Sequence, residues 1–165
     1  MNVNTVKVPM VEWQWKAYEQ LSTNELYAVL KLRQQVFIVE QNCIYNDIDD
    51  VDKLAWHLMG WNVDDPKSPI LCAYLRVTGP GVKYEEVAIG RVLSAIPYRG
   101  SGVGVEIMTK AIEMIAQEFP RQSMRISAQQ HLHNFYAKFG FIRVSEPYDE
   151  DGIPHIEMLN KKGHL

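Results

Sequence analysis

A glycine-rich turn between a predicted strand and a predicted helix carries residues that can bind an anion. Its sequence is Arg99-Gly100-Ser101-Gly102-Val103-Gly104, and it follows an apolar strand. Glycines let the backbone approach a ligand closely, while the free N–H groups and positive dipole end of a new helix attract phosphate. Arg99 adds a fixed cation with donors suited to phosphate oxygens. The turn therefore predicts a phosphate cradle.

The spacing of the glycines excludes two phosphate-binding motifs. A Walker A loop needs a Lys-Ser or Lys-Thr pair after its last glycine, but Val105 and Glu106 follow Gly104. A dinucleotide fingerprint needs G-x-G-x-x-G, and the run from Gly100 to Gly104 is one residue too short. The arrangement that fits is R-x-x-G-x-G, which resembles the pyrophosphate loop of the GNAT superfamily of acyl-CoA-dependent N-acyltransferases. The alternative is a glycine-rich turn without a ligand.

The elements expected around this turn describe a mixed α/β chain. Apolar and polar residues alternate in a strand over 11–16, and Ser22 with Glu25 predicts a capping box for a helix that ends near Glu40. Further strands are expected at 56–61, 70–77, 87–93, 124–128, 141–144 and 155–159, and further helices at 103–119 and 132–139. An acidic turn over 149–152 joins the last two strands. This order agrees with the GNAT fold, which implies one domain over residues 1–165. Its sheet would be mixed, mostly antiparallel, flanked by helices and split for acyl-CoA.

Two further regions carry the resemblance. Phe135 to Phe141 looks like the Phe/Leu-Tyr-x-x-x-Gly-Phe signature of GNAT enzymes, which implies that the hydroxyl of Tyr136 lies beside the thioester sulfur. An Asn commonly stands seven positions before that tyrosine, whereas this chain has Gln129, and Asn134 is expected to supply an amide toward the cofactor instead. The segments 34–43 and 150–155 resemble the ElaA-type branch of the superfamily.

The GNAT pattern assigns backbone groups to the cofactor. Pantetheine is expected to pair with the exposed edge of the strand before the turn, at Val92, Leu93 and Ser94. An N–H group of Leu93 or Ser94 would polarise the thioester carbonyl. The amides of Gly100, Ser101, Gly102, Val103 and Gly104 would hold the pyrophosphate.

Transfer of an acetyl group to an amine needs a base for the ammonium proton and an acid for the leaving thiolate. Tyr136 suits the acid role because its phenol is neutral at pH 7 and can donate to sulfur; the alternative is a tyrosine packed in the core. Glu40, at the end of the first helix, and His57, in the second strand, are the candidate bases. The alternatives are a solvated carboxylate and a structural histidine.

The acidic segment after the first helix suggests a cationic acceptor. Asp47, Asp49, Asp50 and Asp52 would attract an ammonium group, although such a cluster is also typical of a solvated face. His131 and His133 have no recognised zinc spacing, so no metal is expected.

Composition restricts the remaining functions. The chain has 165 residues, a net charge of −3 and no cluster of Lys and Arg, which argues against nucleic-acid binding. Its apolar runs are strand-sized, so no membrane span is expected, and residues 1–9 lack the apolar segment of a signal peptide, so the expected compartment is the cytoplasm. Cys43 and Cys72 are expected to be reduced thiols.

Together these features predict an acetyl-CoA-dependent N-acetyltransferase that acts in a ternary complex on a small-molecule or exposed amine. A homodimer is a superfamily expectation. The alternatives are a non-catalytic acyl-CoA-binding sensor or interaction module and a nucleotide-binding structural protein.

Overall fold

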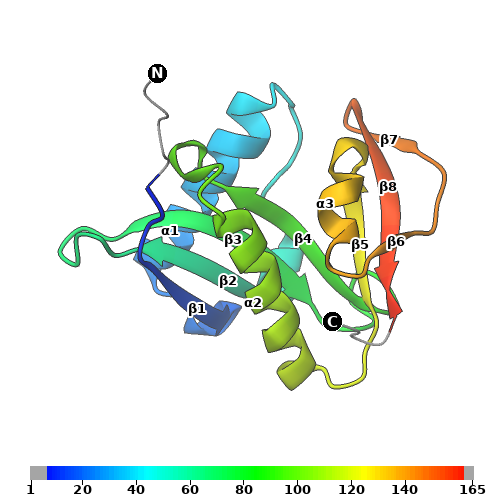
Figure 1. Cartoon of the computed structure of the whole chain (residues 1–165), viewed down its shortest axis with the longest axis horizontal. Coiled ribbons are helices and arrows are strands. Elements are labelled where there is room, and N and C mark those ends of the chain that lie inside the picture. Colours follow the sequence, from blue (N-terminus) through cyan, green and yellow to red (C-terminus); the bar gives the residue numbers. More distant parts are fainter. Residues whose placement is uncertain (1–6, 162–165) are drawn as a thin grey trace.

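One mixed sheet connects most of the chain (Figure 1). The computed structural model describes residues 7–161, so ten residues of the expected domain, 1–6 and 162–165, lie outside the described residues. The eight strands follow the order β1-β2-β3-β4-β5-β8-β6, with β7 paired to β8. Neighbouring strands are antiparallel except β4 and β5, which are parallel. The strands are β1 (Val11–Ala17), β2 (Ala55–Asn62), β3 (Ile70–Thr78), β4 (Val87–Ser94), β5 (Met124–Gln129), β6 (Ile142–Arg143), β7 (Tyr148–Glu150) and β8 (Ile153–Asn160).

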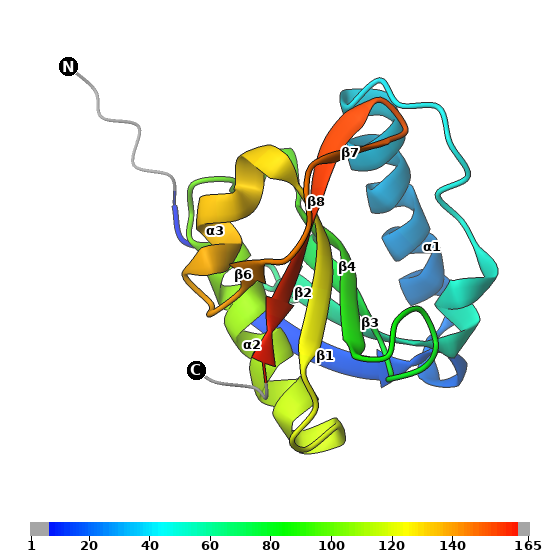
Figure 2. The same ribbon diagram turned by 90° about the vertical axis from the view of Figure 1, so that its right-hand side faces the viewer.

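Helices cover both faces of the sheet (Figure 2). On one face lies α1 (Thr23–Arg33), which begins at the predicted Ser22–Glu25 capping box and continues as a π-helix over Gln34–Glu40. On the other face lie α2 (Val103–Glu118) and α3 (His133–Ala137). Each face has its own apolar core, one built around α2 and the other around α1. The sheet therefore separates two apolar cores.

The sheet opens between β4 and β5. These strands pair only from Val87 to Ile89 on β4 and from Met124 to Ile126 on β5. Directly after this pairing, the register of β4 against β3 jumps from Gly90–Arg76 to Leu93–Tyr74, and Arg91 takes a φ of 54°. Two residues of β4 thus oppose one residue of β3, which is a β-bulge, and a bulge bends the strand that carries it. The bend lets β4 diverge from β5 and produces the predicted split.

The predicted fold class, its helix–strand order and its mostly antiparallel sheet are confirmed, with one strand added. The predicted acidic turn over 149–152 was too long, because its first half belongs to β7. Asp151 and Gly152 alone form the turn, with φ values of 53° and 83°. Positive φ at both central residues matches the twist of a two-residue hairpin. The predicted helix over 132–139 is also shorter, since Gln130–Leu132 is a 3-10 turn. No helix within residues 7–161 is long and apolar enough to cross a membrane.

Candidate active site

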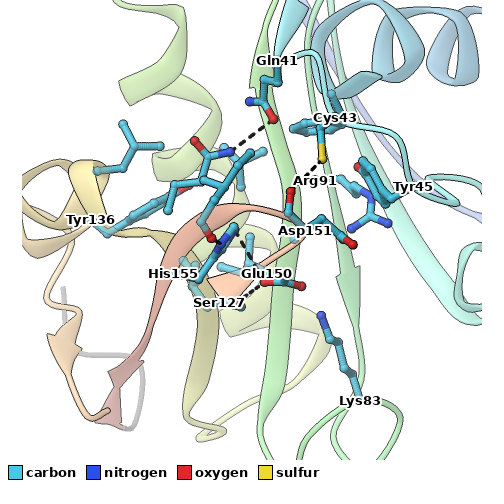
Figure 3. A pocket seen from close by; sticks show the side chains of 18 residues that line it. Gln41, Cys43, Tyr45, Lys83, Arg91, Ser127, Tyr136, Glu150, Asp151 and His155 are labelled. Carbon is cyan, nitrogen blue, oxygen red and sulfur yellow. Dashed lines mark hydrogen bonds and ion pairs between the residues drawn. The ribbon is translucent and has the colours of Figure 1, made fainter. Parts of the chain in front are cut away.

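A cavity of about 120 Å³ occupies the split and reaches both faces of the sheet (Figure 3). Leu132 and Tyr136 line it from the α3 face, whereas Phe37 and Tyr45 line it from the α1 face. The other lining residues come from the two diverging strands, the segment after α1 and the β7–β8 hairpin: Gln41, Cys43, Lys83, Ile89, Gly90, Arg91, Val92, Ile126, Ser127, Gln129, Glu150, Asp151, Ile153 and His155. A molecule on one face can therefore meet a molecule on the other through the sheet.

The exposed edge of β4 offers backbone groups to this split. The amide of Ala95 donates to the carbonyl of Cys72 on β3, at 2.8 Å. Because backbone groups alternate in direction along a strand, the amide of Leu93 faces β3 as well, and that of Ser94 faces the split. Ser94, and not Leu93, is thus the residue that can donate into the split, which corrects the expectation for Leu93.

The glycine turn has the geometry of an anion cradle. Gly100 and Gly102 have φ values of 79° and 94°, a region that favours glycine, and α2 begins directly after Gly102. Within the described part of the chain, four amides of the turn donate to no backbone carbonyl: those of Gly100, Gly102, Val103 and Gly104. The Ser101 amide differs, because it donates to the carbonyl of Tyr98 at 3.3 Å. The prediction of Ser101 as a backbone donor is corrected accordingly.

Arg99 and Glu40 form an ion pair. The guanidinium donates from Nη1 and Nη2 to the two carboxylate oxygens, at 2.5 and 2.8 Å, and Nε donates to the Ser94 carbonyl at 3.2 Å. The hydrogen bond from Arg99 lowers the pKa of Glu40, so this carboxylate is a poor proton acceptor. Glu40 also does not line the cavity. The structure therefore does not support the expectation that Glu40 is the base, and it shows this carboxylate engaging Arg99 of the glycine turn.

Glu40→Gln is accordingly expected to tighten CoA binding by about two- to five-fold, since an exposed ion pair contributes up to about 1 kcal/mol that an incoming phosphate must replace. Isothermal titration calorimetry with CoA measures the effect. A glutamate that instead acted as the base would show unchanged CoA affinity and a large loss of turnover.

Tyr136 lines the cavity with a phenol that no described protein group bonds. Its ring is only 5% exposed and contacts Phe135 and Phe141 edge-on, yet it lines the cavity. No hydrogen-bond partner for its phenol occurs among residues 7–161, and burial raises the phenol's pKa above its ordinary value. A neutral phenol with a free donor thus faces the cavity; its catalytic role stays a prediction.

His57 is fully buried and both of its ring nitrogens are engaged. Nδ1 lies 2.7 Å from the hydroxyl of Tyr74, and Nε2 lies 3.0 Å from the carbonyl of Asp52. Burial lowers the pKa of this imidazole, and it does not line the cavity. The predicted base role of His57 is therefore wrong, and the structural alternative describes it.

The acidic segment is neither a funnel for ammonium groups nor a solvated face. Three of its aspartates pair with three arginines beneath the α1 face: Asp47 with Arg33 and Arg91, Asp52 with Arg33 and Arg76, and Asp49 with Arg76 and Arg91. Asp47 and Asp52 are 6% and 5% exposed. The charges cancel inside the protein, and only Asp50, which pairs with Lys53, is fully on the surface. The expectation that this segment attracts a cationic acceptor is therefore withdrawn.

Comparison with known proteins agrees with this geometry. Residues 80–162 match the family model for the acetyltransferase (GNAT) domain. The chain belongs to the GNAT acetyltransferase family. It is 45% identical to protein ElaA of Escherichia coli over 92% of this chain and 97% of that protein. The crystal structure of E. coli ElaA superimposes with a TM-score of 0.84 over 92% of this chain and 100% of that chain, at 44% identity. An acyl-CoA N-acyltransferase from Pseudomonas aeruginosa superimposes with a TM-score of 0.85 at 39% identity, over 92% and 99% of the two chains.

Part of this cavity is lined by residues to which sequence reasoning gave no chemical role. Ser127, His155 and the hairpin residue Glu150 lie together: the Ser127 hydroxyl donates to Glu150 at 3.0 Å, and His155 Nε2 lies 3.5 Å from the same carboxylate (Figure 3). The available signal was the ElaA-type resemblance itself. Its two segments, 34–43 and 150–155, are far apart in sequence and both reach this cavity.

The structure locates Gln129, which stands where related enzymes commonly have an Asn, and Asn134, the residue expected to contact the cofactor instead. Gln129 lines the cavity and lies 3.4 Å from Gln41, so it spans the split toward the α1 face. Asn134 lies in α3 with its amide oxygen 3.2 Å from the ring of His133, and its contact with a cofactor stays a prediction. No three His, Cys, Asp or Glu side chains within residues 7–161 are arranged to hold a metal ion.

Proposed function

We propose that this GNAT domain is an acetyl-CoA-dependent N-acetyltransferase that transfers the acetyl group to a primary amine in a ternary complex. The observation that supports this most is the cavity through the sheet, with Tyr136 at one end and the polar residues Ser127, Glu150 and His155 at the other. Both substrates can reach it at once from opposite faces, so no acyl-enzyme is needed.

The residues of the split fit an acyl-CoA thioester. The thioester supplies an activated acyl carbon and a sulfur leaving group. The unpaired amides at the start of α2 face the position of a pyrophosphate, and the open edge of β4 can pair with an extended amide-containing chain. The Ser94 amide donates toward the carbonyl oxygen, which gains negative charge as the amine attacks.

The transfer requires three proton movements: the ammonium group loses one proton before attack, the nitrogen loses a second as the amide forms, and the sulfur gains one. The N–C bond forms as the C–S bond breaks, and the electron pair of that bond leaves with sulfur, which takes the phenolic proton of Tyr136. The ammonium proton passes to His155 or Glu150 before attack, and the second proton, lost from nitrogen as the amide forms, returns the Tyr136 phenolate to a phenol. Nδ1 of His155 lies 2.7 Å from the carbonyl of Ile153, and because a carbonyl only accepts, Nδ1 carries the hydrogen. Nε2 of the neutral ring is then free to take a proton.

A non-catalytic acyl-CoA-binding module is the second candidate. Such a module needs the glycine turn and the edge of β4, but it has no use for a phenol and an imidazole at opposite ends of one cavity. The two candidates are separated by release of free CoA thiol from acetyl-CoA in the presence of a panel of primary amines. Acetyl-CoA binding without amine-dependent thiol release from any amine would favour the module.

Gly102→Val is expected to weaken CoA binding by more than ten-fold. The φ of 94° is strained for any residue with a Cβ, and relief of that strain would turn the amides of Val103 and Gly104 away from the pyrophosphate. Calorimetry with CoA on the purified variant measures the loss.

Gly81→Val is the matched control. Gly81 has a φ of 83° and, like Gly102, has no atom within 4 Å of an added Cβ, but it lies in the β3–β4 connection, outside the turn. The free energy of unfolding should fall by a similar amount in Gly81→Val and Gly102→Val, because both substitutions place a Cβ at a positive φ. The CoA affinity of Gly81→Val should stay at the wild-type value. Equal CoA affinity in folded Gly102→Val protein would remove the turn from the site.

A further inference from the structure

The acceptor half of the cavity has positive and negative groups on separate walls. Lys83, from the β3–β4 connection, and Arg91, from the bulge of β4, form one wall, while Glu150 and His155 form another (Figure 3). The cavity measures about 120 Å³, which is room for several water molecules and therefore for a small-molecule ligand.

Arg91 is fixed in place but keeps a donor for a ligand. Its Nε donates to Asp47 at 2.7 Å and its Nη2 donates to the Asp47 carbonyl at 3.2 Å, while the ring of Tyr45 lies 5.5 Å from the guanidinium carbon. Within residues 7–161, no acceptor for Nη1 of Arg91 occurs. The partners of Arg91 therefore orient the guanidinium without engaging all of its N–H donors.

Lys83 adds a cation that the buried aspartates do not neutralise. Lys83 is an exposed residue at the edge of the cavity, and its amino end points toward Glu150 (Figure 3). No carboxylate in the described chain lies within ion-pair distance of it. Loss of water around the amino group lowers its pKa; Glu150 opposes this, and Arg76 and Arg91 add to it. An anion beside Lys83 and Arg91 would relieve the repulsion between these cations.

The opposite wall presents acceptors for a cation. Oε2 of Glu150 and Nε2 of His155 lie 3.5 Å apart, and the hydrogen of this imidazole is on Nδ1. When the ring holds only this hydrogen, both atoms can accept a hydrogen bond, and an ammonium group has several N–H bonds to offer. The ammonium would thus be held by the same groups that deprotonate it.

We propose that the acceptor is a small aminocarboxylate, whose carboxylate is bound by Lys83 and Arg91 and whose amine is bound by Glu150 and His155. This specificity rests on the proposed function of the same site. It separates the substrate from simple alkylamines, which lack the anionic arm, and from diamines, whose second ammonium group would face two cations.

Matched pairs of acceptors test this specificity. Glycine, β-alanine and γ-aminobutyrate are compared with methylamine, ethylamine and propylamine, which carry the same carbon chains up to the missing carboxylate. Calorimetry of CoA-saturated protein measures binding, and thiol release from acetyl-CoA measures turnover. At least one aminocarboxylate should bind about ten- to a hundred-fold more tightly than its paired amine, as expected for charge-assisted hydrogen bonds.

Lys83→Met locates the anionic arm. It should raise the dissociation constant and KM of the preferred aminocarboxylate by about ten-fold or more and leave those of the paired amine near wild type. Lys53→Met is the matched control, because Lys53 pairs with Asp50 on the surface and does not line the cavity. Lys83→Glu should go further and favour a diamine such as putrescine over γ-aminobutyrate.

The outcomes separate this proposal from the function on which it rests. Amines that bind and react as well as their paired aminocarboxylates, or a Lys83→Met protein with unchanged preference, would overturn the aminocarboxylate and leave acetyl transfer intact. Selective, Lys83-dependent binding without thiol release would uphold the acceptor and overturn catalysis. No preference in binding and no thiol release would overturn both.

Discussion

Tyr136→Phe is expected to lower the turnover of acetyl transfer by about 10²–10⁴-fold, with acetyl-CoA affinity and stability near wild type. The substitution removes one oxygen and its proton and leaves the ring against Phe135 and Phe141. Since no protein group in residues 7–161 bonds this phenol, its removal orphans no partner. Steady-state kinetics on an acceptor found in the screen, with calorimetry for acetyl-CoA, gives both numbers.

Tyr45→Phe removes the second phenol that lines the cavity and serves as the comparison. The hydroxyl of Tyr45 already donates to Asp47 at 2.9 Å, so it has no proton to offer to sulfur. Its loss should affect turnover far less than the loss of the Tyr136 hydroxyl. Similar turnover in Tyr136→Phe and wild-type protein would mean that Tyr136 is a packing residue and that water protonates the thiolate.

The glycine turn and the elements around it could be predicted because they are local in sequence. A glycine turn, the strand before it and the helix after it are contiguous, so the spacing from Arg99 to Gly104 already describes the cradle. Gly102 has the positive φ that such a turn requires. What local sequence could not show is the ion pair of Arg99 with Glu40, because the two residues lie 59 positions apart.

The acceptor side depends on contacts between distant elements, and here sequence reasoning failed. A histidine in a strand can be a base or a buried structural residue, and the hydroxyl of Tyr74 on the neighbouring strand decides this for His57. The bulge at Arg91 left no signal in composition or alternation, yet it both opens the split and directs a guanidinium toward the cavity. The sequence placed Glu150 in a turn and His155 in a strand, and the family resemblance included both, but none of these features gave either residue a chemical role.

The acidic segment is the clearest example of contacts between distant elements that the sequence alone could not show. Four aspartates within six positions indicate strong local charge, but the compensating arginines come from α1, β3 and β4. Tyr45 and Cys43, which precede these aspartates, line the cavity, so the ion pairs help to position one wall of it. The charges of the acidic segment are compensated within the protein, so we expect them to act on stability and on the position of this wall.

Arg33→Met is therefore expected to destabilise the protein by about 3–5 kcal/mol, which is the usual cost of removing one partner from a buried ion pair. Arg33 is fully buried and donates to Asp47 Oδ2 at 2.9 Å, to the Asp47 carbonyl at 2.6 Å and to Asp52 Oδ1 at 2.7 Å. Methionine fills most of the volume but leaves these oxygens short of donors. Chemical denaturation monitored by tryptophan fluorescence measures the change.

Arg143→Met is the control, because Arg143 pairs with Glu146 across one short surface segment and that carboxylate is 94% exposed. A surface pair of this kind contributes at most about 1 kcal/mol. If both variants lost the same stability, the buried network would have no special role.

The pH dependence of the Arg33→Met effect identifies the aspartates as its cause. Burial alone would raise the pKa of Asp52, but Arg33 and Arg76 outweigh burial and lower it below the ordinary value. A carboxylate with a lowered folded-state pKa binds protons more readily in the unfolded chain. The stability that it contributes is complete above the unfolded pKa of about 4 and is lost as the pH falls through the folded value. The wild-type advantage over Arg33→Met should thus be constant from pH 8 to about pH 5 and shrink below pH 4. An advantage that persists unchanged at pH 3 would assign the effect of Arg33 to packing of its aliphatic chain instead of to its charge.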